Sequence, residues 1–217
     1  MNDNLRLERK WVFNNIDKIT LLSNLINSNF FFQEQFEERF VNNLYYDNLT
    51  LTAASDNLAG ISSREKIRVR WYGDTIDLFK NPVLERKIKK NFYGYKKYYS
   101  LSKFDKIEIN EKNLSYLTEN INQLVEFKHL NPVSITKYKR IYLISSNNLI
   151  RATLDYDIKY KKVLNYIENF FLSVSDIVLE IKYPHYLDSY LRNHLSGINR
   201  ISKNSKYLNS LINSNFY

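Results

Sequence analysis

The stretch KIRVRW, residues 66–71, alternates cationic and apolar side chains without interruption. In a β-strand, residues two apart project from the same face. As a strand, this segment places Lys66, Arg68 and Arg70 together on one face and its apolar residues on the other. The pattern predicts a sheet strand with one face for packing and one cationic face.

The same alternation recurs along the chain. Charged residues two apart occur at Arg6, Glu8 and Lys10, at Glu85, Lys87 and Lys89, and at Glu180 and Lys182, while Arg140, Arg151 and Asp155 lie in further strand-like segments. We expect Asp155, which shares a face with Arg151, to be its structural partner. Alternating charge is ordinary on solvent-facing sheets. These faces, however, are chiefly Arg and Lys with single carboxylates among them.

Cations turned toward the inside of a fold need water or an anion to compensate them. A phosphate chain is a fitting anion, because Arg presents a planar fork to phosphate oxygens and Lys adds a point charge. The recurrence of charged faces therefore favours an internal anion-binding surface over a set of solvated outer faces.

Many strand-like segments with few helices between them predict an α+β fold. We expect a mainly antiparallel, closed β-barrel that forms a tunnel, with helices packed outside, as a single domain over residues 1–217. The expected strands are 4–13, 39–47, 65–73, 82–90, 135–145, 149–160 and 175–183. The expected helices are 16–26, 114–125 and one from Pro184 to about Gly197.

Composition narrows the chemistry. The chain has a formal net charge of +9, no cysteine and only three histidines, so we expect any metal to be a hard, oxygen-ligated Mg²⁺ or Mn²⁺. No P-loop or Rossmann glycine motif is present. The first residues do not resemble a signal peptide and no apolar run reaches about 18 residues. We expect a soluble, cytoplasmic chain without a membrane span.

Aromatic residues leave one alternative partner to weigh. The 18 Tyr and 13 Phe residues are interleaved with Lys and Arg, as on surfaces that stack single-stranded nucleic acid. No single-strand-binding motif accompanies them. We therefore expect no nucleic-acid partner.

Two neighbouring motifs carry a family resemblance. IRVRWYG at 67–73 followed by VLERKIKKN at 83–91 resembles the paired signature of the catalytic domain of the vacuolar transporter chaperone (VTC) polyphosphate polymerases, within the triphosphate tunnel metalloenzyme superfamily. Other segments follow in the family's order: ERKWVF, VNNLYYDN, YKRIYL, LIRATLD, IVLEIKY and RISKNSKY. The resemblance spans about residues 5 to 208.

The resemblance implies specific roles. Tunnel-lining residues that grip phosphates would be Lys10, Arg68, Arg70, Lys87, Arg140 and Arg151. Glu180 would ligate the Mn²⁺ or Mg²⁺, with Glu8 as a second metal candidate. Further phosphate-binding candidates are Lys66, Lys89, Lys182, Lys203 and Lys206, with Lys97 less firmly matched. If the tail is helical, Lys203 and Lys206 would share a helical face.

The implied reaction transfers the terminal phosphate of ATP to a growing polyphosphate chain and releases ADP. ATP and polyphosphate would be the partners, and a membrane-bound partner is left open. Arg6, Glu8 and Lys10 differ from the two glutamates before a lysine that open most members of the superfamily, and are nearer the VTC branch. Hydrolysis of triphosphates by the same fold and a non-catalytic polyphosphate-binding module remain alternatives.

Overall fold

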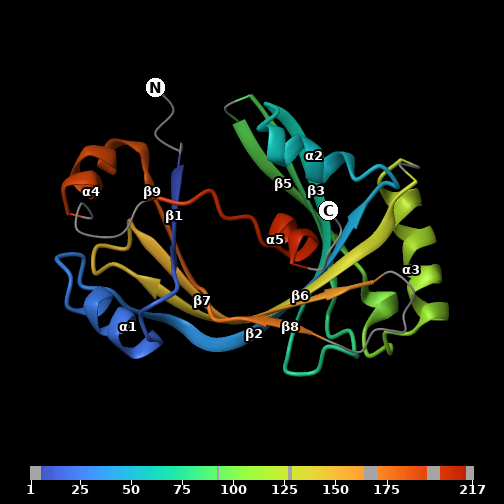
Figure 1. Cartoon of the computed structure of the whole chain (residues 1–217), viewed down its shortest axis with the longest axis horizontal. Coiled ribbons are helices and arrows are strands. Elements are labelled where there is room, and N and C mark those ends of the chain that lie inside the picture. The colour runs from blue at the N-terminus through green and yellow to red at the C-terminus, as the bar shows by residue number, and fades with distance from the viewer. Residues whose placement is uncertain (1–5, 92, 127–128, 164–170, 195–200, 214–217) are drawn as a thin grey trace. The chain divides into compact units, whose positions relative to one another are not determined.

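The computed structural model describes residues 6–91, 93–126, 129–163, 171–194 and 201–213 (Figure 1). Its nine strands form one sheet in the order β1-β9-β7-β6-β2-β3-β4-β5, with β8 paired to β7. The strands are β1 Arg6–Phe13, β2 Gln33–Asp47, β3 Ser63–Tyr72, β4 Val83–Lys90, β5 Tyr93–Ser100, β6 Asn131–Ile144, β7 Arg151–Lys162, β8 Leu172–Val174 and β9 Ile177–Pro184. The helices are α1 Lys18–Ile26, α2 Thr52–Ala59, α3 Glu111–Leu124, α4 Asp188–His194 and α5 Lys206–Ile212, with short 3₁₀ turns at Ser102–Phe104 and His185–Leu187.

The sheet confirms the α+β class and its antiparallel character. Strand β9 pairs antiparallel with β1 and with β7, and β3 pairs antiparallel with β2 and β4. A closed barrel is not confirmed, because the strand order begins at β1 and ends at β5, and the described residues show no hydrogen-bonded pairing between these two strands.

The chain divides into two compact units. The first comprises Met1–Arg39, Tyr138–Ile158 and Val174–Asn204, and the second Phe40–Lys137, Lys159–Ser173 and Ser205–Tyr217. Strands β2, β6 and β7 are long enough to contribute residues to both.

The core of the first unit comes from the apolar faces of its strands. Trp11, Leu154, Leu179 and Ile181 are buried there. Helix α1 begins at the N-cap Asp17, whose carboxylate accepts from the backbone N–H of Thr20 and so satisfies a free helix-end donor. It packs on this core through buried leucines, which fixes the apolar side of the sheet here.

The second unit repeats this design around Trp71. Alternation along β3 buries Ile67, Val69 and Trp71 on one side, as the sequence predicts. Helix α3 covers this side with residues at helical spacing, Leu114, Leu117 and Ile121, all buried. The opposite face of β3 is left for its cationic residues.

The predicted elements compare well with the structure. All seven predicted strands exist, although β2 begins at Gln33 and not at residue 39. Strands β5 and β8 and helices α2 and α5 were not predicted; β5 reads YGYKKYYS and is almost wholly exposed, so it lacks the buried alternation that marks a strand.

The predicted helix from Pro184 needs correction. Pro184 is the last residue of β9, a 3₁₀ turn follows at His185–Leu187, and only then does α4 begin at Asp188. Gly197, the predicted end, lies outside the described residues. Within the described part of the chain, no helix combines the length and apolar character needed to cross a bilayer.

Candidate functional site

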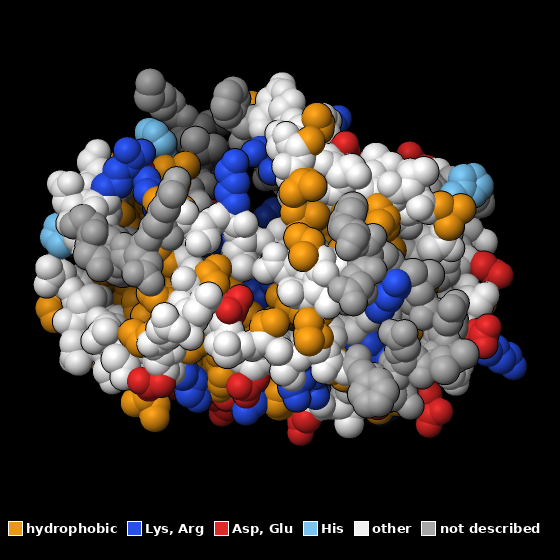
Figure 2. Space-filling model, in the orientation of Figure 1, with side chains coloured by type: hydrophobic (Ala, Val, Ile, Leu, Met, Phe, Trp, Pro, Cys, Tyr) orange, Lys and Arg blue, Asp and Glu red, His pale blue; other side chains and the backbone are white. Residues whose placement is uncertain are grey.

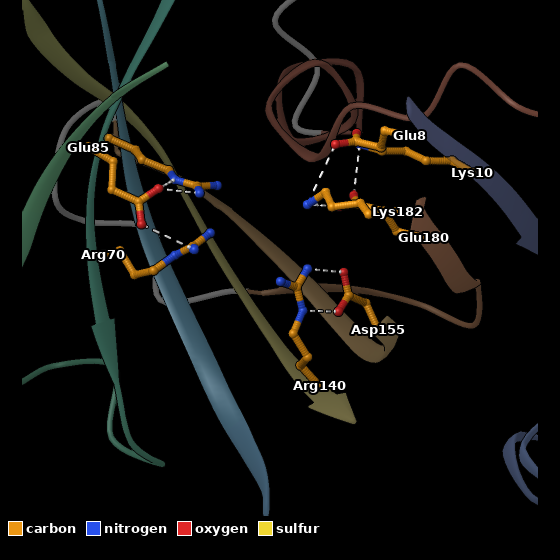
Figure 3. Close-up of polar contacts among 9 residues, drawn as sticks. Glu8, Lys10, Arg70, Glu85, Arg140, Asp155, Glu180 and Lys182 are labelled. Carbon is orange, nitrogen blue, oxygen red and sulfur yellow. Dashed lines mark hydrogen bonds and ion pairs between the residues drawn. The ribbon is translucent and has the colours of Figure 1, made fainter. Parts of the chain in front are cut away.

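The first unit carries a ring of opposite charges on the polar faces of β1 and β9 (Figure 3). Antiparallel register sets Glu8 opposite Lys182 and Lys10 opposite Glu180. The Lys10 Nζ lies 2.9 Å from Glu8 Oε1 and 3.1 Å from Glu180 Oε2. The Lys182 Nζ lies 2.5 Å from Glu180 Oε1 and 3.6 Å from Glu8 Oε2. Each ammonium therefore contacts both carboxylates.

Strands β6 and β7 extend this ring. Arg140 makes a bidentate pair with Asp155, with Nε and Nη2 at 2.5 and 2.7 Å from the two carboxylate oxygens (Figure 3). The expectation that Asp155 is the partner of Arg151 is therefore wrong: Arg140 reaches it from the neighbouring strand. Arg151 is exposed and lies opposite Lys182. We call Glu8, Lys10, Arg140, Arg151, Asp155, Glu180 and Lys182 the carboxylate-rich cluster.

The charges of this cluster favour the ionised forms of Glu180, Lys10 and Arg140. Burial opposes ionisation of Glu180, but Lys10, Lys182 and Arg140 outweigh it and lower its pKa well below the ordinary value. Burial likewise opposes the charge on Lys10, yet Glu180 and Glu8 raise the pKa of Lys10. For Arg140, Asp155 is the largest of the influences that overcome burial and raise its pKa.

The donor chemistry of this cluster fits a hard divalent cation. Among the described residues, no three side chains of His, Cys, Asp or Glu gather to hold an ion by themselves. Glu8 and Glu180 approach the same two ammoniums, so they form a two-carboxylate face. Mg²⁺ characteristically takes one or two carboxylates and completes its shell with water and substrate phosphates.

The second unit carries a different charged group on β3 and β4. The Glu85 carboxylate lies between two guanidiniums: Arg68 Nε is 2.8 Å from Oε2, and Arg70 Nη1 is 3.2 Å from Oε1 (Figure 3). Burial would raise the pKa of Glu85, but Arg68 and then Arg70 lower it. Arg68 and Arg70 also reach the hydroxyl of Tyr45 and the amide oxygen of Asn43 on β2.

Three lysines stand in one row beside this pair. The register sets Lys66 on β3 opposite Lys87 on β4, and Lys87 opposite Lys96 on β5. Like charges directly opposite one another destabilise a sheet. The row is therefore built at a cost that a bound anion would offset. We call Lys66, Arg68, Arg70, Glu85, Lys87 and Lys96 the basic cluster.

Lys96 is a residue that the sequence analysis missed. It shares the face of Glu85, whose pKa it helps to lower, whereas Lys97 lies opposite Arg86 on the other face of β4 and β5. Lys97 therefore does not face the basic cluster. Lys89, another candidate, lies opposite Arg64, further along the face of Lys87.

The C-terminal helix α5 packs on the polar side of the second unit. Its Tyr207 hydroxyl donates to the buried carboxylate of Asp47, and its ring stacks on Tyr45 with centroids 5.0 Å apart. Its N-cap Ser205 accepts a 3.0 Å hydrogen bond from Lys66 Nζ. Helix α5 and its N-cap thus contact Asp47 and Tyr45 on β2 and Lys66 of the cationic face of β3.

Lys203 and Lys206 do not share a helical face as predicted. Lys206 is the first residue of α5, and Lys203 precedes the N-cap Ser205. The Ser202 backbone N–H, next to Lys203, donates to the Lys10 carbonyl oxygen at 2.8 Å, within the first unit. The two lysines therefore belong to different local environments.

Surface charge alone does not mark either cluster. On the face shown in Figure 2, acidic and basic side chains lie close together along the lower edge, and most of the rest of that face is uncharged. The charged side chains singled out from sequence are instead concentrated on strand faces: seven lie in the carboxylate-rich cluster and five in the basic cluster. The geometry suits binding of a multiply charged anion in either unit.

Comparisons with known proteins agree with this geometry. A model of the VTC domain matches residues 6–214. A Bacillus halodurans protein provisionally named an adenylate cyclase shares 13% identity, with 96% of this chain and 98% of that chain covered and a TM-score of 0.56. A Hippeastrum protein, provisionally named an adenylyl cyclase and described as having a dominant triphosphatase activity, shares 15% identity, with 97% of each chain covered and a TM-score of 0.54.

These structural likenesses concern the fold alone, because the identities are low. No curated protein matches the chain. The family model, by contrast, spans nearly all of the described residues, including both clusters. The chain belongs to the VTC domain family.

Proposed function

We propose that this chain is a single tunnel domain, residues 1–217, that transfers the terminal phosphate of ATP to a growing polyphosphate chain. The observation that carries the reaction is the VTC domain match over residues 6–214. The resemblance of IRVRWYG and VLERKIKKN to the polymerase signature supports the same reading.

The two clusters supply the parts that phosphoryl transfer needs, which are chiefly positioning and stabilisation of negative charge. In the basic cluster, Arg68 and Arg70 are forks for phosphate oxygens and Lys66 and Lys87 add point charge. Lys89, Lys203 and Lys206 would bind other parts of the phosphate chain. A polyanion would relieve the mutual repulsion of the lysine row.

In the carboxylate-rich cluster, Glu180 and Glu8 would hold Mn²⁺ or Mg²⁺ while Arg140 and Arg151 bind phosphate oxygens. When bound, the ion would offset charge on the phosphate groups. Lys10 and Lys182, which now contact both glutamates, would then turn toward phosphate. Their long side chains have the rotamer freedom for this change.

The product made from ATP tests this function. Purified protein is incubated with ATP and Mn²⁺, and phosphate chain length and ADP are measured. We expect ADP together with long phosphate chains. Glu180→Gln keeps the shape of the side chain and removes its charge, so we expect chain synthesis to fall by about three orders of magnitude with the fold retained.

Other products would favour the alternatives. Free phosphate without chains would indicate a triphosphatase, the activity ascribed to the Hippeastrum protein. Tripolyphosphate binding by an inert wild type and an equally inert Glu180→Gln variant would indicate a non-catalytic binding module. Asp157→Asn is a matched control, since this exposed carboxylate contacts only the surface Lys139 among the ion pairs of the described residues.

A further inference from the structure

The hydroxyl of Thr153 is an unexplained polar group within the first unit. Its Oγ1 is buried and has no hydrogen-bond partner among the described residues. Burying a hydroxyl without a partner destabilises a fold, and such groups are rare in native proteins. The β-branched shape of threonine suits a strand, but valine would supply that shape without the buried hydroxyl.

The position of Thr153 connects it with the carboxylate-rich cluster. On β7 it lies directly opposite Glu180, which in turn lies opposite Lys10 on β1. Alternation along the strand puts Thr153 on the same face as Arg151 and Asp155, one on each side. The hydroxyl is therefore placed among the charges proposed to bind phosphate.

The carboxylates beside Thr153 already have other donors. Both oxygens of Asp155 accept from Arg140, and each oxygen of Glu180 contacts a lysine ammonium. Four cations and three carboxylates make up the cluster, so an incoming anion would find a surplus of donors beside the hydroxyl of Thr153, which has no hydrogen-bond partner in the described part of the chain. Neutral hydroxyls commonly complete the coordination of oxyanions whose charge is met by Arg and Lys.

We propose that Thr153 is a substrate-positioning residue that donates a hydrogen bond to a phosphate oxygen bound by Arg151. This role rests on the proposed function. The hydroxyl rotates about a single bond and needs no change of backbone to reach a ligand on its own strand face. Because Oγ1 is buried in the ligand-free chain, the side chains that cover it would have to move before a phosphate oxygen could reach it. Thr153 thereby fixes the orientation of a phosphate group that Arg151 holds by charge.

Binding of tripolyphosphate to three variants tests this role. Thr153→Val removes the hydroxyl and keeps the branched shape, and Thr153→Ser keeps the hydroxyl. Thr75→Val is the control, an exposed threonine outside both clusters. Dissociation constants are measured by calorimetry, and melting temperatures are measured without ligand.

We expect Thr153→Val to weaken tripolyphosphate binding about tenfold, the effect of losing one hydrogen bond to a charged group. Its melting temperature without ligand should equal or exceed that of the wild type, because no native hydrogen bond is lost. Thr153→Ser should bind within about threefold of the wild type, and Thr75→Val should be unchanged.

Three results would overturn this role. If Thr153→Val binds tripolyphosphate with the same dissociation constant as the wild type, the hydroxyl has only a bound water as its partner. Ligand-free Thr153→Val could instead melt at a lower temperature than the wild type while Thr153→Ser loses binding to a similar extent. The hydroxyl would then stabilise the fold and not position phosphate. Failure of the wild type itself to bind tripolyphosphate would overturn the proposed function, and this role with it.

Discussion

The two charged clusters differ in how their charge is balanced. The carboxylate-rich cluster has four cations against three carboxylates, and both Glu180 and Asp155 are paired with cations at 2.5–3.1 Å. The basic cluster has five cations around Glu85 alone, with three lysines in one row. By formal charge the first is nearly neutral, whereas the second carries a surplus of four positive charges, which a bound anion would offset.

This difference assigns distinct tasks within the proposed function. A nearly neutral, preassembled cluster holds its carboxylates ionised and in fixed positions, as a metal site requires. A cluster with surplus charge binds a polyanion strongly but tolerates changes in its exact position. Removing a carboxylate should therefore destabilise the ligand-free protein in either cluster, and in the basic cluster a bound anion should offset the loss.

The largest expected effect comes from breaking a pair in the carboxylate-rich cluster. Asp155→Asn leaves the guanidinium of Arg140 mostly buried without its counter-charge, and we expect the free energy of unfolding to fall by about 3 kcal/mol. Urea denaturation measures this change. Asp157→Asn, whose carboxylate is exposed, should cost less than about 0.5 kcal/mol. Equal losses in the free energy of unfolding of the two variants would show that burial of the Arg140–Asp155 pair does not contribute to stability.

In the basic cluster, bound tripolyphosphate should supply the negative charge that is lost when Glu85 is replaced by glutamine. At about 100 times its dissociation constant, tripolyphosphate should stabilise the wild type by about 2.7 kcal/mol. Glu85→Gln removes the carboxylate charge that pairs with Arg68 and Arg70, so its melting temperature without ligand should be lower than that of the wild type. Tripolyphosphate should raise it at least as much as it raises that of the wild type. Sulfate at matched ionic strength is the control. A response to tripolyphosphate no larger than that to sulfate would contradict anion binding here.

Acid should affect the two clusters unequally. A carboxylate with a lowered folded pKa stabilises the fold above its unfolded pKa of about 4.3, and this stability is lost as pH falls below that value. Glu180 has the more strongly lowered pKa, and Glu85 a lowered one. Between about pH 5 and pH 3 the wild type should lose stability, Glu85→Gln somewhat less, and Glu180→Gln least. Urea denaturation at each pH tests this order, and a reversed order would contradict it.

The smallest effect is expected at the C-terminal lysines. Lys203 is exposed and Lys206 half-buried, so alanine at both should weaken tripolyphosphate binding by about fivefold, the scale of a charge pair near water. Lys161 and Lys162, a basic pair outside both clusters, provide the control when changed to alanine. Equal losses in the two double variants would indicate only an effect of total charge.

Local spacing was enough to predict which residues share a face. The alternation in residues 66–71 predicts the buried Trp71 and the cationic side of β3 because side-chain direction along a strand repeats every two residues. The same rule correctly grouped Glu180 with Lys182, and Glu8 with Lys10. The rule does not predict strand β5, because this strand is almost wholly exposed and shows no alternation of buried and exposed residues.

Partners across strands required the tertiary structure. Asp155 pairs with Arg140 and not with Arg151, and Lys96 rather than Lys97 joins the face of Glu85. Which residues meet depends on strand order and register, and these are set by packing of segments far apart in sequence. The sequence therefore determines the faces and the family motifs. The fold determines which charges pair, and it buries the hydroxyl of Thr153 where no described residue offers it a hydrogen bond.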